Sequence, residues 1–185
     1  MRLNLGCGDF KIDGWVNVDK YGHFDADVVH DLEQFPWPFD DDTAEEVLLN
    51  HVLEHLGQDT GVFLGIMKEL YRVSRAGAQV RIHVPHPRHD DFITDPTHVR
   101  AILPDTLAMF DREVNERWRT EKAANTQLAI YTGTDFKMVS ATVTPDDRFK
   151  DESGDVAVSI EELLEKARSE LNVIKEYQIT LEVRK

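Results

Sequence analysis

The chain has 185 residues, 41% of them hydrophobic, which is enough for one domain with its own core. Its 35 acidic residues outnumber 21 basic ones, and the formal net charge of −14 disfavours a nucleic-acid partner. The single cysteine excludes an internal disulfide, and no apolar run reaches the ~18 residues of a membrane span.

Short apolar runs predict strands along the first half of the chain. The first run contains Leu3 and Leu5 and begins at Arg2, which leaves no room for a signal peptide, so we expect a cytoplasmic protein. Four further strands are expected at 16–18, 28–29, 45–52 and 79–84.

An amphipathic helix is expected between the last two of these strands. In "TGVFLGIMKELYRVSRAG" (60–77) apolar residues recur every three or four positions, with Asp59 or Thr60 as the cap and Gly77 as the stop. Strands that alternate with helical crossovers favour a parallel sheet with helices on its faces.

The C-terminal part has a different pattern. A helix is expected over 104–119, starting at a proline, and a strand over 136–144. Ser159 and Glu162 have the spacing of a capping box at the start of another helix, and alternation over 177–183 predicts a last strand. This last pair of strands could be antiparallel and lie at one edge of the sheet.

The segment "LNLGCGDFKIDGWVNVD" (3–19) resembles a nucleotide-binding turn with parts missing. A dinucleotide fold would have a third glycine at position 11, which is Lys11, and a helix to receive the pyrophosphate. The segment from Gly8 to Val16 is shorter than the ~10 to 12 residues of a helical crossover. Pyrophosphate is therefore a poor candidate ligand.

Two aspartates at strand ends point to a different ligand. Asp19 ends the second strand, where a carboxylate accepts hydrogen bonds from ribose hydroxyls, and Asp31 follows the third, where it could accept from an adenine amino group. A ligand with ribose and adenine but no phosphate fits this arrangement.

Four successive segments resemble the motifs of class I S-adenosylmethionine (SAM)-dependent methyltransferases. They are "LNLGCG", "VNVD", "HDLEQFPWPFDDDTAEEVLLNHVLEHL" and "LYRVSRAGAQVRIHVP", and they most resemble the small bacterial enzymes linked to sugar or surface-polysaccharide pathways. The resemblance covers Leu3 to about Pro85, and a weaker similarity continues in "DPTHVRAILPDTL". It implies an α/β, Rossmann-like fold with a mostly parallel sheet, an antiparallel edge strand and a shortened first helix.

The resemblance also implies a set of cofactor-binding residues. Gly6, Cys7 and Gly8 would line the methionine portion, and Asp19 would hold the ribose. Asp31 and the backbone of Leu32 would bind the adenine edge, while Asn50 and His51 would face the cofactor and the incoming substrate. The N-terminal helical cover of many members has no counterpart, so residues 86–128 of the single domain 1–185, or another subunit, would enclose the substrate.

The implied function is transfer of a methyl group from SAM to a small hydroxylated acceptor, with a sugar as one candidate. Such an acceptor benefits from a base, and His51, His55 and His98 are the candidates, with His51 at the end of the fourth strand the best placed. We expect a small-molecule substrate and neither a nucleic-acid nor a membrane partner, and leave open a homo-oligomer.

Two alternatives remain open. The chain could bind SAM as a sensor or binding module without turnover. "HVLEH" (51–55) also matches the H-x-x-E-H of some zinc hydrolases, provided that it is helical throughout.

We assign no metal ligand from the sequence, although a cation site at this motif is possible. His51, Glu54 and His55 form a mixed nitrogen and oxygen set that suits zinc better than magnesium. Further ligands could come from a histidine-rich segment that supplies His83, His86, His89, Asp90, Asp91 and His98.

Overall fold

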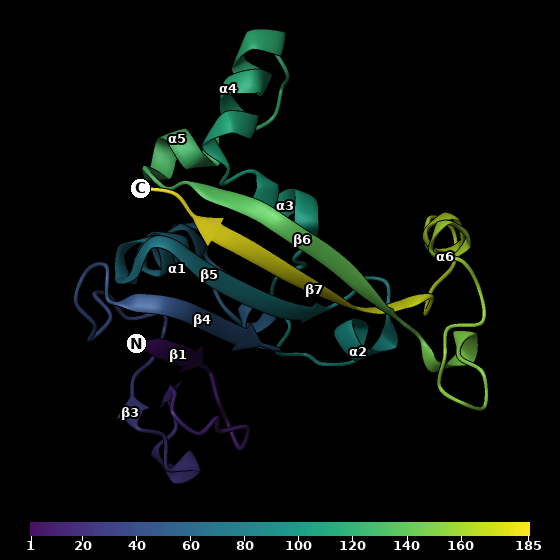
Figure 1. Cartoon of the computed structure of the whole chain (residues 1–185), viewed down its shortest axis with the longest axis horizontal. Coiled ribbons are helices and arrows are strands. Elements are labelled where there is room, and N and C mark those ends of the chain that lie inside the picture. Colours follow the sequence, from purple (N-terminus) through teal and green to yellow (C-terminus); the bar gives the residue numbers. More distant parts are fainter.

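The computed structural model describes all 185 residues and has one seven-stranded sheet of order β3-β2-β1-β4-β5-β7-β6 (Figure 1). The strands are β1 (Arg2–Leu5), β2 (Val16–Asp19), β3 (Val28–Val29), β4 (Ala44–Asn50), β5 (Ser74–Pro85), β6 (Phe136–Pro145) and β7 (Ile174–Val183). All neighbours from β3 to β5 pair in parallel, whereas β7 is antiparallel to both β5 and β6. The expected α/β, Rossmann-like fold is confirmed, with the antiparallel strand in the edge pair.

Six helices and three single turns connect the strands. The helices are α1 (Thr60–Val73), α2 (Asp90–Ile93), α3 (Pro104–Ala108), α4 (Arg112–Glu121), α5 (Leu128–Thr132) and α6 (Ile160–Ala167). The 3₁₀ turns are η1 (Gly22–Phe24), η2 (Leu53–His55) and η3 (Asp147–Phe149). None of the helices combines the length and the apolar character needed to cross a membrane.

The connection from β1 to β2 contains turns and no helix, which confirms the shortened first crossover. Two buried asparagines organise it. The side-chain amide of Asn4 donates to the carbonyl of Phe10 at 2.7 Å and to Oδ1 of Asn17 at 3.0 Å. The same oxygen of Asn17 accepts from the amide of Ile12 at 2.8 Å. These hydrogen bonds hold the loop where a longer chain would use helix packing.

Helix α1 begins as predicted and ends early. The Asp59 carboxylate accepts hydrogen bonds from the second and third amides that follow it, at 2.7 and 3.2 Å, so Asp59 is the cap. The prediction that Gly77 stops this helix is wrong. Ser74 already pairs with Ala44, and Gly77 lies within β5 at a φ of 76°, beside a register shift between β4 and β5. Strand pairing therefore ends the helix at Val73.

The single helix expected over 104–119 is also wrong, because the chain breaks between α3 and α4. Phe110 is fully buried, and its carbonyl accepts from the amide of Phe136 at the start of β6. Asp111 then caps α4 and binds Arg184. The break attaches this segment to the sheet edge, which a periodic pattern does not reveal.

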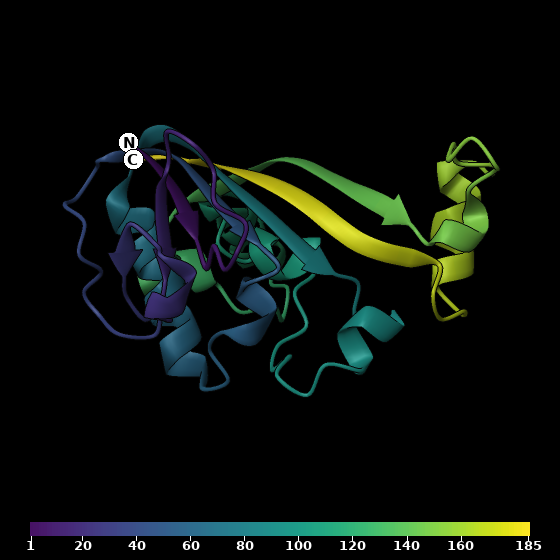
Figure 2. The same ribbon diagram turned by 90° about the horizontal axis from the view of Figure 1, so that it is seen from below.

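Strands β6 and β7 continue beyond the other strands and carry α6 and η3 at their far end, away from the main core (Figures 1 and 2). The main core includes the fully buried Leu3, Leu5 and Ile66, whereas the extension has a small apolar cluster around Leu163. Ser159 is the cap of α6, as its spacing with Glu162 predicts. Because β7 runs antiparallel, its first residues lie at the carboxyl ends of the parallel strands.

Candidate functional site

A cavity of about 330 Å³ opens at the carboxyl ends of β1, β2 and β4. The order of the sheet reverses here, because β1 has β2 on one side and β4 on the other. Ligands of open α/β sheets bind at such a reversal. The lining residues are Gly6, Asp19, Lys20, Tyr21, Phe24, His30, Asp31, Leu32, His51, Val52, His55, Leu56 and Thr97.

The glycine turn after β1 forms one wall. Gly6 has a φ of 67°, and a Cβ at this position would lie 2.6 Å from the side chain of Val52, so the close approach of the two segments requires glycine. Gly8 has a φ of 48°, and its amide donates to Oδ2 of Asp19 at 2.9 Å. The turn is thereby fixed to the end of β2.

Asp19 is 8% exposed and lines the cavity next to the glycine turn. Its Oδ2 accepts from the amide of Gly8, and its Oδ1 accepts from the amide of Tyr21, both at 2.9 Å. Each carboxylate oxygen can accept more than one hydrogen bond, so acceptor capacity remains for a ligand hydroxyl. The carboxylate is thus rigid and able to bind a donor in the cavity.

The segments after β2 and β3 supply a mixed apolar and acidic wall. Tyr21 and Phe24 lie edge to face with ring centroids 6.4 Å apart. Asp31 accepts from the amide of Glu33 at 3.0 Å, and Leu32 is buried beside it. This combination offers flat apolar surface together with a carboxylate and backbone polar groups.

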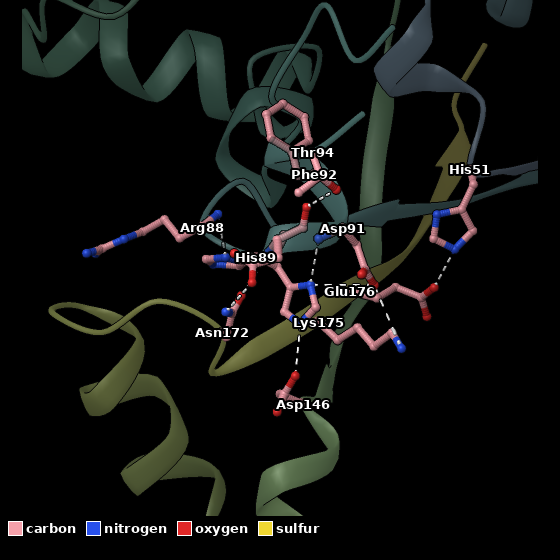
Figure 3. Close-up of polar contacts among 12 residues, drawn as sticks. His51, Arg88, His89, Asp91, Phe92, Thr94, Asp146, Asn172, Lys175 and Glu176 are labelled. Atoms are coloured by element: carbon pink, nitrogen blue, oxygen red, sulfur yellow. Dashed lines mark hydrogen bonds and ion pairs between the residues drawn. The ribbon is translucent and has the colours of Figure 1, made fainter. Parts of the chain in front are cut away.

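His51 follows β4 and is bound by a residue from the other end of the chain (Figure 3). Its Nε2 lies 2.8 Å from a carboxylate oxygen of Glu176 in β7, and its Nδ1 lies 3.5 Å from Glu54. The Glu54 and Glu176 carboxylates hold the pKa of His51 above its ordinary value, although burial opposes them. Burial raises the pKa of Glu176, but hydrogen bonds from Gln178 and His51 outweigh it and lower this pKa overall. Both pKa shifts favour the protonated imidazolium of His51 beside an ionised Glu176 carboxylate.

The structure brings together six of the residues predicted for the site. Those lining the cavity are Gly6, Asp19, Asp31, Leu32, His51 and His55.

Four other predicted residues do not line it. Cys7 is buried, and burial raises the pKa of its thiol. Gly8 contributes through Asp19. Asn50 accepts a hydrogen bond from Nδ1 of His83 at 3.0 Å. The ring of His98 packs against that of His55 and is stacked on Phe92. Of the range 86–128, Thr97 is the residue that lines the cavity.

Sequence reasoning missed several residues of the site, with Glu176 the most important. The alternating pattern of β7 placed it next to a strand, but nothing in the sequence pairs it with a histidine 125 positions earlier. Tyr21 could have been found from its place two residues after the strand-ending Asp19, while Thr97 depends on the course of a loop.

The segment "HVLEH" is not helical throughout, which is the condition that the hydrolase alternative requires. His51 has a φ of 54°, and only residues 53–55 form a 3₁₀ turn. The two histidines are therefore not on one helical face, as the hydrolase motif requires.

No protein family and no curated protein sequence matches the chain. Solved structures do match its fold. A SAM-dependent methyltransferase of Archaeoglobus fulgidus is 20% identical, with a TM-score of 0.63 over 98% of this chain and 85% of that one. The 1,6-didemethyltoxoflavin-N1-methyltransferase of Burkholderia thailandensis, solved with S-adenosylhomocysteine, is 12% identical, with a TM-score of 0.52 over 100% and 71%.

A further similar structure has a very different acceptor. The 16S rRNA (adenine(1408)-N(1))-methyltransferase of Catenulisporales acidiphilia is 13% identical, with a TM-score of 0.53 over 100% of this chain and 85% of that one. The chain thus has the Rossmann-like fold of these methyltransferases, and identities this low are evidence for the fold alone.

Proposed function

We propose that the chain is a SAM-dependent methyltransferase that acts on a small acceptor bearing a hydroxyl group, with a sugar as the leading candidate. The strongest support is the Asp19 carboxylate, which two backbone amides hold in the wall of the cavity. The adjacent hydroxyls of a ribose can donate hydrogen bonds to the acceptor positions that remain on this carboxylate.

The rest of the cavity suits the same cofactor. Tyr21 and Phe24 offer aromatic surface for an adenine, and Asp31 with the backbone of Leu32 offers polar groups for its edge. The loop between β1 and β2 contains no helix, so the site lacks the helix N-terminus that a pyrophosphate prefers, and SAM has no phosphate. Its volume of about 330 Å³ lies in the range of small-molecule sites.

When bound, SAM supplies a methyl group on a sulfonium, and the thioether that leaves does not need to be protonated. The chain then has to align the acceptor, exclude water and remove the hydroxyl proton. Glu176 accepts a hydrogen bond from Nε2 of His51, so in the neutral ring Nδ1 carries the lone pair and is the atom that can take the proton. The cation formed on His51 lies between the Glu54 and Glu176 carboxylates, which stabilise it.

The size of the acceptor is inferred from charge. A formal net charge of −14 repels a polyphosphate chain, so we propose a small molecule, although one similar structure acts on rRNA. Four further expectations stay predictions. They are the cytoplasmic location, the lack of a membrane partner, the question of a homo-oligomer, and the substrate-side role of residues 86–128.

Calorimetric titration with SAM and with S-adenosylhomocysteine tests the proposed cofactor. We expect binding at one site, and Asp19→Ala should weaken it about 30-fold or more, the equivalent of about 2 kcal/mol for lost charged hydrogen bonds. Asp13→Ala removes an exposed aspartate outside the cavity and should leave the affinity unchanged. No binding at millimolar SAM would rule the proposed function out.

Methyl transfer is measured separately with SAM labelled in its methyl group and a panel of simple sugars, sugar phosphates and phenols. Label in one of these acceptors is expected. SAM binding with label in none of them would favour the alternative of a binding module.

A further inference from the structure

We propose that Glu54, His55 and His98 form a binding site for a divalent transition-metal cation such as zinc. The ligand atoms of the three side chains lie within 4.8 Å of one another. Two of these residues come from η2, and the third comes from a loop more than 40 positions later, so the fold assembles the set.

The Glu54 carboxylate is the first reason. The residue is completely buried, and neither of its carboxylate oxygens has a hydrogen-bond partner. Its one charged contact is the 3.5 Å approach to Nδ1 of His51, which is longer than a hydrogen bond. A buried carboxylate without partners is costly, and native proteins leave such groups where they bind a proton, an ion or a metal.

The hydrogen bonds made by Nδ1 of the two histidines are the second reason. Nδ1 of His98 lies 2.9 Å from the carbonyl of Phe92, which can only accept, so Nδ1 is the donor and Nε2 is the nitrogen that the neutral ring offers to a metal. His55 is fixed by the same logic. Its Nδ1 lies 2.9 Å from the hydroxyl of Thr97, and that hydroxyl gives its own proton to Asp95 at 2.6 Å.

Thr97 therefore accepts from Nδ1 of His55, and Nε2 is again the nitrogen that the neutral ring offers to a metal. Metal-binding histidines are held in this way, with the distal nitrogen donating to a carbonyl or to a hydroxyl and carboxylate relay. The Asp95 carboxylate also lies 3.7 Å from Nε2 of His98 and adds negative charge beside the three ligands.

The backbone fixes the two halves of the cluster relative to each other. The amides of Val99 and Arg100 donate to the carbonyl of Glu54 at 2.9 and 3.1 Å, so the loop that carries His98 is attached to η2. The rings of His55 and His98 are 4.5 Å apart between centroids. Zinc bonds of ~2.0 to 2.2 Å would bring the three ligand atoms closer together than they are here.

The donor set selects the kind of cation. One carboxylate and two imidazoles favour zinc, cobalt or nickel over magnesium and calcium, which prefer oxygen ligands. Three protein ligands leave a coordination position free, and His55 and Thr97 also line the cavity. A cation at this site would therefore adjoin the space proposed for the acceptor.

Calorimetric titration of the full chain, free of any tag and treated with a chelator, with ZnCl₂, MnCl₂ and MgCl₂ tests the site without SAM or an acceptor. We expect one equivalent of zinc to bind, with manganese weaker and magnesium weakest. Glu54→Gln and His98→Gln should each weaken zinc binding at least 30-fold. His23→Gln, which removes an exposed histidine outside the cluster, should leave it unchanged.

Cobalt provides a second readout on the unaltered protein. Bound Co²⁺ should give visible absorption bands of nitrogen and oxygen coordination, and Zn²⁺ should displace them. Thr97→Val keeps all three ligands but frees Nδ1 of His55, and should weaken zinc binding about tenfold. Absence of cobalt bands, equal affinity for zinc and magnesium, or unaltered zinc binding in Glu54→Gln and His98→Gln would overturn the assignment. SAM binding is tested with Asp19→Ala, and zinc binding is tested without SAM. A failure of the proposed function and a failure of the proposed metal site can therefore be told apart.

Discussion

At the scale of single residues, His51 has an environment that differs from that of the other histidines. It lies at a positive φ directly after β4, with its Nε2 2.8 Å from Glu176 and its Nδ1 3.5 Å from Glu54. Its side chain is 45% exposed, so a bound molecule can reach the imidazole. The geometry gives the histidine a defined tautomer and Glu176 the role of a positioning residue.

We predict that His51→Asn lowers kcat for an acceptor identified in the panel by about 10² to 10⁴, the usual contribution of a general base. Glu176→Gln should lower kcat about tenfold with little change in KM, because it disturbs the tautomer without removing the imidazole. Steady-state kinetics of both variants provides the check.

Glu182→Gln makes the same charge change further along β7, away from the cavity, and should behave like the unaltered protein. Unchanged kcat in His51→Asn would show that another group takes the proton.

At the scale of elements, Asn115 connects α4 to α5. The residue is completely buried, its side-chain amide donates to the carbonyl of Met109, and its Oδ1 accepts from the amide of Ala129, both at 3.0 Å. These two hydrogen bonds replace apolar packing between two short helices. The same segment breaks the helix expected over 104–119, since Phe110 and Asp111 bind residues at the sheet edge.

We predict that Asn115→Ala lowers the free energy of unfolding by about 1 to 2 kcal/mol, because it removes two buried hydrogen bonds, while the amide of Ala129 keeps its hydrogen bond to the carbonyl of Met109. Urea denaturation followed by circular dichroism measures the change. Arg117→Ala, at an exposed position of the same helix, should change stability by less than about 0.5 kcal/mol. An equally small effect of Asn115→Ala would mean that α4 and α5 are held by other contacts.

At the scale of the whole molecule, His86 links stability to pH. It is 6% exposed, its ring packs 5.1 Å from that of Tyr177, and burial lowers its pKa to about 4. In the unfolded chain His86 binds a proton with the ordinary pKa of ~6.5, whereas in the folded chain it binds this proton only near pH 4. The contribution of a neutral His86 to the free energy of unfolding is therefore fully present above pH 6.5, and it is lost as the pH falls from 6.5 to about 4.

We predict that His86→Asn flattens this dependence. The asparagine does not titrate, and its side-chain oxygen can still accept from the amide of Arg88, as Nδ1 of His86 does at 3.1 Å. Between pH 7 and 5 the free energy of unfolding of the unaltered protein should fall by about 2 kcal/mol more than that of the variant. Parallel urea titrations at the two pH values measure the difference, and equal slopes would contradict a neutral His86 in the folded state.

Local patterns were enough to predict much of the fold and half of the site. Residues close in sequence define strands, caps and turns, so the glycine turn, the short β1–β2 connection, the cap at Asp59 and the strand-ending Asp19 were all predictable. The end of α1 at Val73 and the break before Asp111 were not, because strand pairing competed with helical periodicity and prevailed.

The sequence by itself determined that two glycines and Asp19 meet at the end of adjacent strands, because neighbouring parallel strands bring their carboxyl ends together. Only the tertiary structure decided what surrounds His51 and Glu54. The antiparallel β7 carries Glu176 to His51, and two backbone hydrogen bonds to Glu54 bring His98 beside His55. Contacts between residues far apart in the chain depend on strand direction and loop course, which no local pattern encodes.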